Sequence, residues 1–254
     1  MDLQLDGKRC VITGASQGIG RATAKMLAAE GCRVALVGRR PEPLDDVAGE
    51  IRSAGYGEPL VIAQDVTAVD APSRIRERAE AALGGVDILI NSAGGSRTIP
   101  WDAGDDVWRE GMELNFGASR RLAIEFIPGM QSTGFGRIIN ITGTSEPPVV
   151  NVASTAKAAV HAWAKGLSRV VAKDGITVNS IAPAPGIVRS EQILTKLFPS
   201  DEARDAYIAD NVPVGYMGEA EDVGCVAVFL ASPLSRFITG EVLHADGGAR
   251  RFAF

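Results

Sequence analysis

The stretch Thr13-Gly14-Ala15-Ser16-Gln17-Gly18-Ile19-Gly20 lies between an apolar run at 10–12 and a helical pattern at 21–28. This order predicts a buried strand, a glycine-rich turn and the start of a helix. Glycine permits a positive φ and lets the backbone approach a ligand closely. The free N–H groups at a helix start, with the positive end of the helix dipole, hold phosphate groups. We therefore expect a nucleotide pyrophosphate to bind here, against Gly14, Ser16, Gln17, Gly18, Ile19 and Gly20.

The glycine spacing in this stretch is Gly-x-x-x-Gly-x-Gly. The commoner dinucleotide fingerprint is Gly-x-Gly-x-x-Gly. An ordinary glycine-rich turn is the simpler alternative, but the position between a strand and a helix favours a phosphate site.

Apolar runs recur along the whole chain, and helical patterns separate them, for instance at 72–83, 105–127 and 154–172. Continuous rather than alternating hydrophobicity is typical of a parallel sheet that is covered on both faces. Repeated strand–helix units predict right-handed crossovers and a doubly wound α/β sheet. Because no linker or repeat interrupts the pattern, we expect a single domain over 1–254. The runs predicted as strands are 10–12, 33–37, 59–63, 86–90, 137–141, 176–181 and 241–244.

The composition excludes several classes of protein. A length of 254 residues with 46% hydrophobic residues is enough for a full core, and the net charge of −5 argues against a general nucleic-acid binder. The apolar runs are too short to span a bilayer, and the first residues do not resemble a secretory signal. Cys10, Cys32 and Cys225 are far apart, which fits a reducing cytoplasm, and with only two histidines we expect no metal site.

Ligands of doubly wound sheets bind at the carboxyl ends of the strands, so the residues after each strand are candidates. Arg39 and Arg40 follow the second strand, where an arginine suits the 2′-phosphate of the cofactor. The two arginines therefore favour NADP(H) over NAD(H). The alternative is that both are ordinary solvated arginines at a helix start. Asp65-Val66 follows the third strand, where a carboxylate can accept from an adenine amino group. Asn91-Ser92-Ala93-Gly94 follows the fourth, and its small residues let the chain pass close to a cofactor.

Taken in order, these motifs resemble those of one family. The chain resembles the short-chain dehydrogenase/reductases, in the branch similar to 3-oxoacyl-(acyl-carrier-protein) reductases. The resemblance implies a Rossmann-like seven-stranded parallel sheet with helices on both faces, a nicotinamide cofactor, and a homotetramer or homodimer. It also implies hydride transfer between the nicotinamide and a carbonyl or alcohol carbon. The matching residues are Thr13 to Gly20, Asp65-Val66, Asn91 to Gly94, Asn115, Lys157, Pro185-Gly186, and the tail from Ile238-Thr239-Gly240 to Asp246-Gly247-Gly248.

The resemblance also implies roles for single residues. In the family a tyrosine transfers the proton, and a lysine one helical turn later lowers the tyrosine pKa and holds the nicotinamide ribose. A serine orients the substrate, and an asparagine holds a water of the proton relay. Lys157 and Asn115 match the lysine and the asparagine, and Pro185, Gly186 and Val188 match a cofactor-binding turn.

The two remaining positions depart from the family pattern. The tyrosine position is Ala153, whose methyl group cannot transfer a proton, and the serine position, counted from the fifth strand, is Gly143. Thr142, Thr144 or Ser145 are hydroxyl-bearing neighbours that could project into the site.

Other proton donors are conceivable near Lys157. Ser154 lies three residues before it, so both can share a helix face, and Thr155 adjoins Ser154. A water held by Lys157 and Asn115 is a further alternative. His161, one turn beyond Lys157, is expected to pack at a helix–helix contact.

These patterns predict an NADP(H)-dependent oxidoreductase that acts on a small ketone-like or 3-oxoacyl substrate, with an amphipathic substrate lid at 190–211. The alternatives are a catalytically impaired NADP(H)-binding pseudoenzyme, or an engineered Tyr→Ala variant of an active reductase. Because the loops around Gly143 and Pro185 also differ from the family, natural divergence is the better explanation. A non-redox lyase is the weakest alternative, since such lyases tend to lose the glycine-rich loop.

Overall fold

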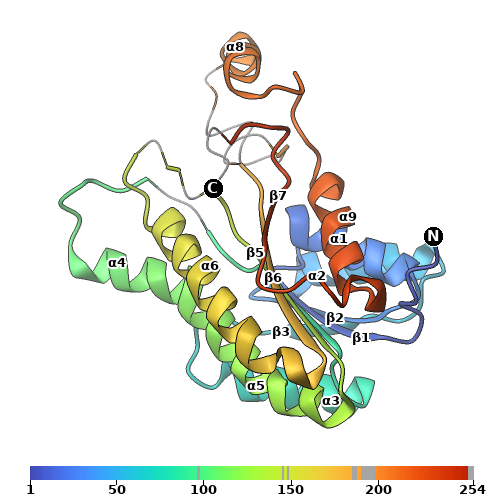
Figure 1. Ribbon diagram of the computed structural model, residues 1–254. Coiled ribbons are helices and arrows are strands. Elements are labelled where there is room, and N and C mark those ends of the chain that lie inside the picture. Colours follow the sequence, from blue (N-terminus) through green and yellow to red (C-terminus); the bar gives the residue numbers. More distant parts are fainter. Residues whose placement is uncertain are drawn as a thin grey trace.

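The computed structural model describes residues 1–95, 98–144, 146–147, 149–184, 188–189, 198 and 200–250. Its described residues form one parallel sheet of seven strands in the order β3-β2-β1-β4-β5-β6-β7 (Figure 1). Each predicted apolar run is confirmed as a strand, with ends that differ by at most two residues. The strands are β1 Arg9–Thr13, β2 Arg33–Gly38, β3 Leu60–Ala63, β4 Ile88–Asn91, β5 Gly136–Ile141, β6 Ile176–Ala182 and β7 Val242–His244.

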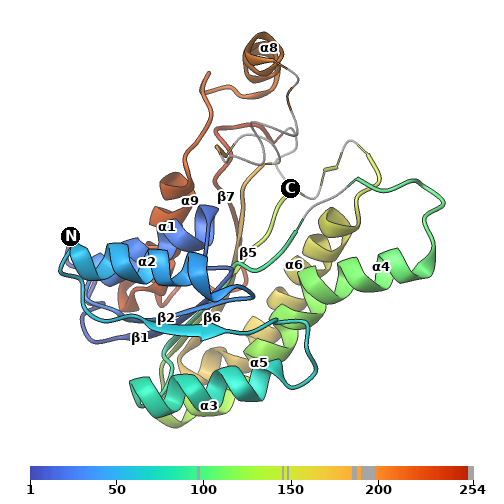
Figure 2. The same ribbon diagram turned by 180° about the vertical axis from the view of Figure 1, so that it is seen from behind.

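Helices cover both faces of this sheet, as the sequence predicts (Figures 1 and 2). On β1, Cys10 and Ile12 pack into the core on one face, and Val11 packs into the core on the other. Both faces are therefore buried, which is why the strands are apolar at every position. The helices α1 Gly18–Ala29, α2 Pro41–Ser53 and α9 Ala220–Ala231 cover the first face, and α3 Ala71–Leu83, α5 Ala118–Thr133 and α6 Val152–Val171 cover the second.

The strand order reverses between β1 and β4, because the chain crosses from β3 back past β1 before β4 is added. The carboxyl ends of strands on either side of such a reversal diverge and leave a crevice for a ligand. The turn at 14–18 and the loop at 92–95 lie at this point.

The segment predicted as one helix at 105–127 is divided in the structure. It consists of α4 Asp105–Met112, a π-helical turn η1 Glu113–Gly117, and α5, which continues past Pro128 to Thr133. A π turn holds one extra residue per hydrogen-bonded ring, and such turns concentrate at functional sites. The remaining elements are α8 Asp201–Asn211, which stands beyond the carboxyl ends of the strands, and the short 3₁₀ turns η2 Ala172–Asp174 and η3 Pro233–Ser235 (Figure 1).

Two negative findings apply to the described part of the chain. None of its helices is both long and apolar enough to cross a membrane. No group of three or more His, Cys, Asp and Glu side chains in it is arranged to hold a metal ion.

Candidate active site

The turn after β1 is packed so tightly that only glycine fits. Gly14 has φ +66°, and a Cβ placed on it would lie 2.8 Å from the Ser92 carbonyl oxygen and 2.9 Å from Ala93 Cα. A Cβ on Gly20 would overlap the carbonyl group of Gly14. These two glycines therefore allow the start of α1 and the loop after β4 to close on the turn.

The N-terminus of α1 is left open. Its N-cap residue Gln17 has an extended backbone and forms no side-chain capping hydrogen bond. Gly18, at φ +53°, is exposed, and a Cβ there would meet nothing within 4 Å. The first N–H groups of a helix have no intrahelical partner, so this end offers donors and a positive dipole to an anion that approaches from solvent.

The hydroxyl of Thr13 fixes the neighbouring loop. Its Oγ1 accepts hydrogen bonds of 3.1 Å from both Ser92 N and Ala93 N, and it donates to the Ile90 carbonyl at 3.4 Å. The loop after β4 is thereby held beside the glycine turn. Sequence reasoning names Thr13 only as part of the motif; the signal for its role is a hydroxyl at the end of a strand, directly before the glycine.

Asn91 uses its side chain inside the sheet. It is 2% exposed, and its Nδ2 donates to Asn140 Oδ1 at 3.0 Å on the neighbouring strand. A ligand contact from Asn91 would thus come from its main chain. The sequence does not single out Asn140, because a polar residue within a strand gives no sign of which side chain it will bond.

Arg39 and Arg40 both lie exposed after β2, and Arg40 is the N-cap of α2. Asp65, after β3, accepts hydrogen bonds from Thr67 N at 2.9 Å and from Thr67 Oγ1 at 2.8 Å. These hydrogen bonds, with a smaller effect of the Arg39 charge, lower the pKa of Asp65. Arg39 and Asp65 therefore lie close enough to interact at the edge where an adenosine ribose would bind, and Val66 beside them is buried.

Asn115 lies in the π-helical turn, and both ends of its amide are bonded to backbone. Nδ2 donates to the Gly111 carbonyl at 2.9 Å, and Oδ1 accepts from Gly95 N at 3.1 Å. A Cβ on Gly94 would lie 3.0 Å from Asn115 Oδ1. The side chain therefore anchors the loop after β4 to the helix that covers it.

Lys157 reaches the same loop from α6. A Cβ on Gly94 would lie 3.8 Å from Lys157 Cε, and a Cβ on Gly143 would lie 3.5 Å from Lys157 Cδ and 4.0 Å from Nζ. The lysine side chain thus extends between the loops that follow β4 and β5. Burial lowers its pKa to about 8, because desolvation disfavours the ammonium form.

The hydroxyls of the two threonines near this lysine are used elsewhere. Thr142 is 3% exposed, and its Oγ1 lies 3.0 Å from the Ile181 carbonyl oxygen and 2.8 Å from His161 Nε2, so that this hydroxyl has two hydrogen-bond partners. Thr155 is exposed and donates back to the Asn151 carbonyl at 3.2 Å. His161 therefore forms a hydrogen bond with the loop after β5, a contact that the sequence does not indicate. Burial, and then nearby positive charges, lower its pKa to about 4.

Ala153 is 1% exposed in the first turn of α6, and Ser154 beside it is half-buried. Val188 is also buried and pairs with Gly218 in an isolated parallel bridge. The predictions for Ser145, Pro185 and Gly186 lie outside the described residues.

Of the lid predicted at 190–211, the structure describes Phe198, Ser200 and helix α8. Ser200 caps α8 by accepting from Ala203 N at 3.2 Å, and the rings of Phe198 and Tyr207 lie 5.4 Å apart. The other residues of 190–199 lie outside the described residues.

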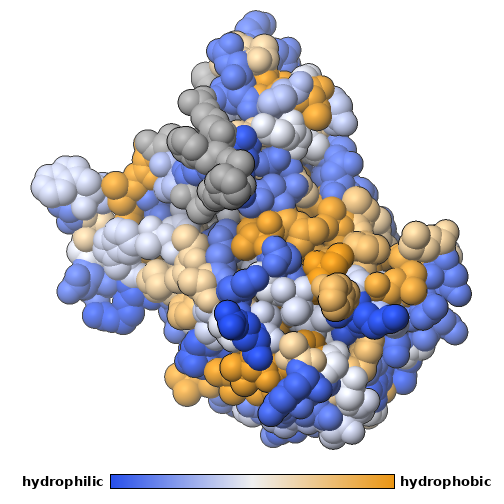
Figure 3. All heavy atoms as spheres, in the orientation of Figure 1, coloured by the Kyte–Doolittle hydropathy of each residue, from blue (hydrophilic) through white to orange (hydrophobic). Residues whose placement is uncertain are grey.

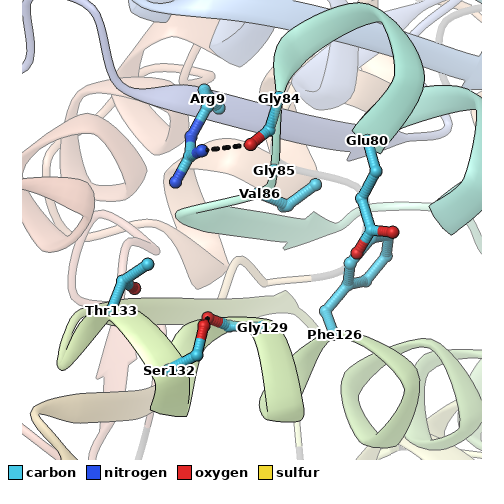
Figure 4. A pocket seen from close by; sticks show the side chains of 9 residues that line it. All are labelled: Arg9, Glu80, Gly84, Gly85, Val86, Phe126, Gly129, Ser132 and Thr133. Carbon is cyan, nitrogen blue, oxygen red and sulfur yellow. Dashed lines mark hydrogen bonds between the residues drawn. The ribbon is translucent and has the colours of Figure 1, made fainter.

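A hollow elsewhere on the surface does not belong to this site (Figure 4). It opens at the amino ends of β1 and β4, and Arg9 Nη1 closes one side by donating to the Gly84 carbonyl at 2.7 Å. Since Asp87 pairs with the same guanidinium at 2.6 Å, the hollow presents no free charge from Arg9. Its lining consists of Arg9, Glu80, Gly84, Gly85, Val86, Phe126, Gly129, Ser132 and Thr133.

Comparison with known proteins agrees with this geometry. The family model described as enoyl-(acyl carrier protein) reductase matches residues 14–250. The chain is 34% identical to the 3-oxoacyl-(acyl-carrier-protein) reductase of Vibrio cholerae, over 97% of this chain and 98% of that protein. It belongs to the short-chain dehydrogenase/reductase family.

Further members of this family are similar over nearly the whole chain. The short-chain reductase protein NovJ of Streptomyces niveus is 33% identical, over 94% of this chain and 92% of that one. A 7α-hydroxysteroid dehydrogenase, solved with NADH and 7-oxo glycochenodeoxycholic acid, superposes with a TM-score of 0.91 at 29% identity, covering 100% of this chain and 98% of that one. A short-chain type dehydrogenase/reductase from Mycobacterium marinum has a TM-score of 0.85 at 30% identity, covering 97% and 96%.

As a member of the short-chain dehydrogenase/reductases, the chain belongs to an enzyme family of NAD(P)-dependent oxidoreductases that act on small molecules. The glycine turn, the open start of α1 and the close approach at Gly94 fit such a dinucleotide. When bound, the nicotinamide supplies or accepts a hydride.

Proposed function

We propose that this protein is an NADP(H)-dependent oxidoreductase that transfers a hydride between nicotinamide and a ketone-like or 3-oxoacyl substrate. The observation that carries the proposal is that Lys157 of α6 and the start of α1, at Gly20, lie against the same loop, 92–95. The first would hold the nicotinamide ribose, and the second would hold the pyrophosphate. The names of the similar reductases suggest the substrate class.

The preference for NADP(H) rests on Arg39 and Arg40. Their side chains are exposed, and the nearest acidic residue after β3, Asp65, is already bonded to Thr67. A guanidinium at this point suits the 2′-phosphate of NADP(H). Proteins that bind NAD(H), whose ribose carries no phosphate, usually have an acidic residue there. Titration of the purified protein with NADPH and with NADH, followed by cofactor fluorescence, tests this preference directly.

The reaction half of the site differs from the family pattern. We place Ala153 at the family's tyrosine position and Gly143 at its serine position, so neither position carries a hydroxyl. Ser154, Ser145 and a water between Lys157 and Asn115 stay as alternative groups at the substrate oxygen, and the bonded hydroxyls of Thr142 and Thr155 are weaker candidates.

A second candidate function follows from Ala153 and Gly143, the two positions that carry no hydroxyl. A protein that binds NADP(H) without transferring hydride, whether by natural loss or by an engineered Tyr→Ala change, would also keep the α1 start and lack the hydroxyls. A panel of ketones and 3-oxoacyl thioesters with NADPH separates the two functions: oxidation of NADPH supports the oxidoreductase. Binding of NADPH with no oxidation across the panel supports the pseudoenzyme.

The proposal includes a homotetramer or homodimer. Strand β7 is the last strand of the sheet, and hydrophobic side chains gather over β7 and α9 (Figure 3). Around α9, Phe229 and Leu234 are more than a third exposed, and Phe237 is fully exposed. An edge strand beside exposed apolar residues favours pairing with a second copy. Light scattering of the eluting protein measures the number of copies.

A further inference from the structure

We propose that Lys157 itself donates the proton to the carbonyl oxygen during reduction. This inference rests on the proposed oxidoreductase function and names the group that performs its acid step. It gives the lysine a direct contact with substrate, in addition to the ribose contact that the family resemblance implies.

The position of the lysine is the first argument. A Cβ on Gly143 would lie 4.0 Å from Lys157 Nζ, so a serine hydroxyl at that position would come within hydrogen-bond distance of the ammonium group. With glycine at 143 and alanine at 153, neither position supplies a hydroxyl that could pair with Nζ. The ammonium group is thus the polar group that α6 offers there.

The lack of partners is the second argument. Among the described residues, we find no hydrogen bond or ion pair to Lys157 Nζ, so its N–H groups are free to donate to a ligand. Arg250 in the tail is the cationic neighbour of this region, where His161 on α6, with a pKa lowered to about 4, and His244 on β7 also lie. Two carboxylates from flanking segments are paired with arginines: Glu146 with Arg250, and Glu113 with Arg121.

The other acids are placed elsewhere. Tyr56, Tyr207 and Tyr216 are exposed, and they lie after α2, on α8 and after α8. Thr142 and Thr155 donate to backbone carbonyls. A serine hydroxyl is a far weaker acid than an ammonium group whose pKa lies near 8, and general acids work best when their pKa lies near the working pH.

The step balances as follows. Reduced nicotinamide supplies the hydride, with its electron pair, to the carbonyl carbon. As the C=O double bond opens, the N–H bond at Lys157 Nζ breaks and the O–H bond of the alcohol forms. Lys157 is left as a neutral amine and regains a proton from water.

Three variants separate this role from ribose binding. Lys157→Arg keeps the positive charge and donors for a ribose but is too weak an acid, so we expect kcat to fall by about 10²–10⁴ with little change in NADPH affinity. Lys157→Ala should lose activity similarly, and added methylamine or ethylamine should restore at least about tenfold by supplying the missing acid. Lys165→Arg, the same change at an exposed lysine of α6 that pairs with Glu241, should keep kcat within about threefold of the parent.

A measurement without cofactor checks the group itself. Competitive acetylation of the cofactor-free protein across pH, with mass spectrometry of the peptide that contains Lys157, should give a midpoint near 8, with the other lysines as internal references. If the wild type reduces substrate and Lys157→Arg retains its rate, the acid step is overturned and the oxidoreductase function stands. The same conclusion follows if the wild type is active and amines fail to rescue Lys157→Ala. A wild-type protein that binds NADPH but reduces no substrate overturns the proposed function and this acid step together.

Discussion

The starts of α1 and α6 lie at the same edge of the sheet and are built in opposite ways. At α1 no side chain caps the helix, and Gly18 leaves the first N–H groups open to solvent. At α6 the Asn151 side chain accepts from Ala153 N at 2.9 Å and from Ser154 N at 3.2 Å. The first helix start is suited to an anion, and the second satisfies its own donors.

This difference divides the site into two halves. The nucleotide half keeps every element that a phosphate requires: a positive-φ glycine turn, an open helix end and a loop fixed by Thr13. The reaction half keeps Lys157 and Asn115 but has alanine and glycine where hydroxyls would be expected. The comparison teaches that the two halves are built independently, around different helix starts, and each prediction below alters one half.

The largest effect is expected from Ala153→Tyr. Lys157 follows position 153 by one helical turn, so a phenol there would share its face and have its pKa lowered by the ammonium charge. We expect carbonyl reductase activity to rise by up to about 10², because the phenol would take over the proton step from Lys157, which already supplies part of the usual 10²–10⁴ of general acid catalysis. The pH profile should show an ionisation below about 10, the pKa of free tyrosine.

Ala153→Phe is the matched control, because it adds the ring without the hydroxyl. Gly143→Ser can be combined with the tyrosine, since a Cβ at 143 would make only an ordinary 3.5 Å contact with Lys157 Cδ. A folded variant that binds NADPH and shows no gain would mean that the altered loops have removed the geometry for a phenol.

The next effect concerns stability in the nucleotide half. In Gly20→Ala the new methyl group would overlap the Gly14 carbonyl, and overpacking of this kind costs about 1–3 kcal/mol of unfolding free energy. Gly49→Ala, in α2, is the control: a Cβ there meets nothing within 4 Å, and a helical Gly→Ala change stabilises by about 0.5–1 kcal/mol. Urea unfolding of both variants measures the difference; equal stabilities would contradict the tight packing at Gly20.

The sequence predicts the sheet well because a strand buried on both faces must be apolar throughout, as Cys10, Val11 and Ile12 are. It also predicts the tight glycine turn after β1, because glycine spacing follows directly from backbone sterics. It does not predict the π turn around Asn115, since a widened helical turn has the same apolar pattern as a regular one. Nor does it predict that Thr142 is bonded to His161, because that contact joins residues 19 apart through tertiary packing.

A smaller effect is expected for cofactor choice. Arg39→Ala removes a charge-assisted contact to the 2′-phosphate, and such contacts contribute roughly 1.5–3 kcal/mol, so NADPH binding should weaken about ten- to a hundredfold. NADH lacks that phosphate, so its affinity should hardly change. Fluorescence titrations of Arg39→Ala and of Arg40→Ala with both cofactors test this and show which arginine dominates. Equal losses for the two cofactors would refute the assignment.

The smallest effect concerns His161, which links the reaction half to the core. Burial, and then the charges of His244, Arg250 and Lys157, lower its pKa from 6.5 to about 4. Between these two pH values the unfolded chain binds a proton that the folded protein does not, so stability falls as the pH falls from 6.5 to 4, and His161 has no effect above that window. His161→Gln keeps an uncharged donor near Thr142 and removes the titration. Between pH 7 and pH 5, the wild type should therefore lose about 1–2 kcal/mol more unfolding free energy than the variant, as measured by urea unfolding at both pH values. The same pH dependence in both proteins would mean that the folded protein protonates His161 as readily as the unfolded chain does, and that the contact with Thr142 does not hold the ring neutral.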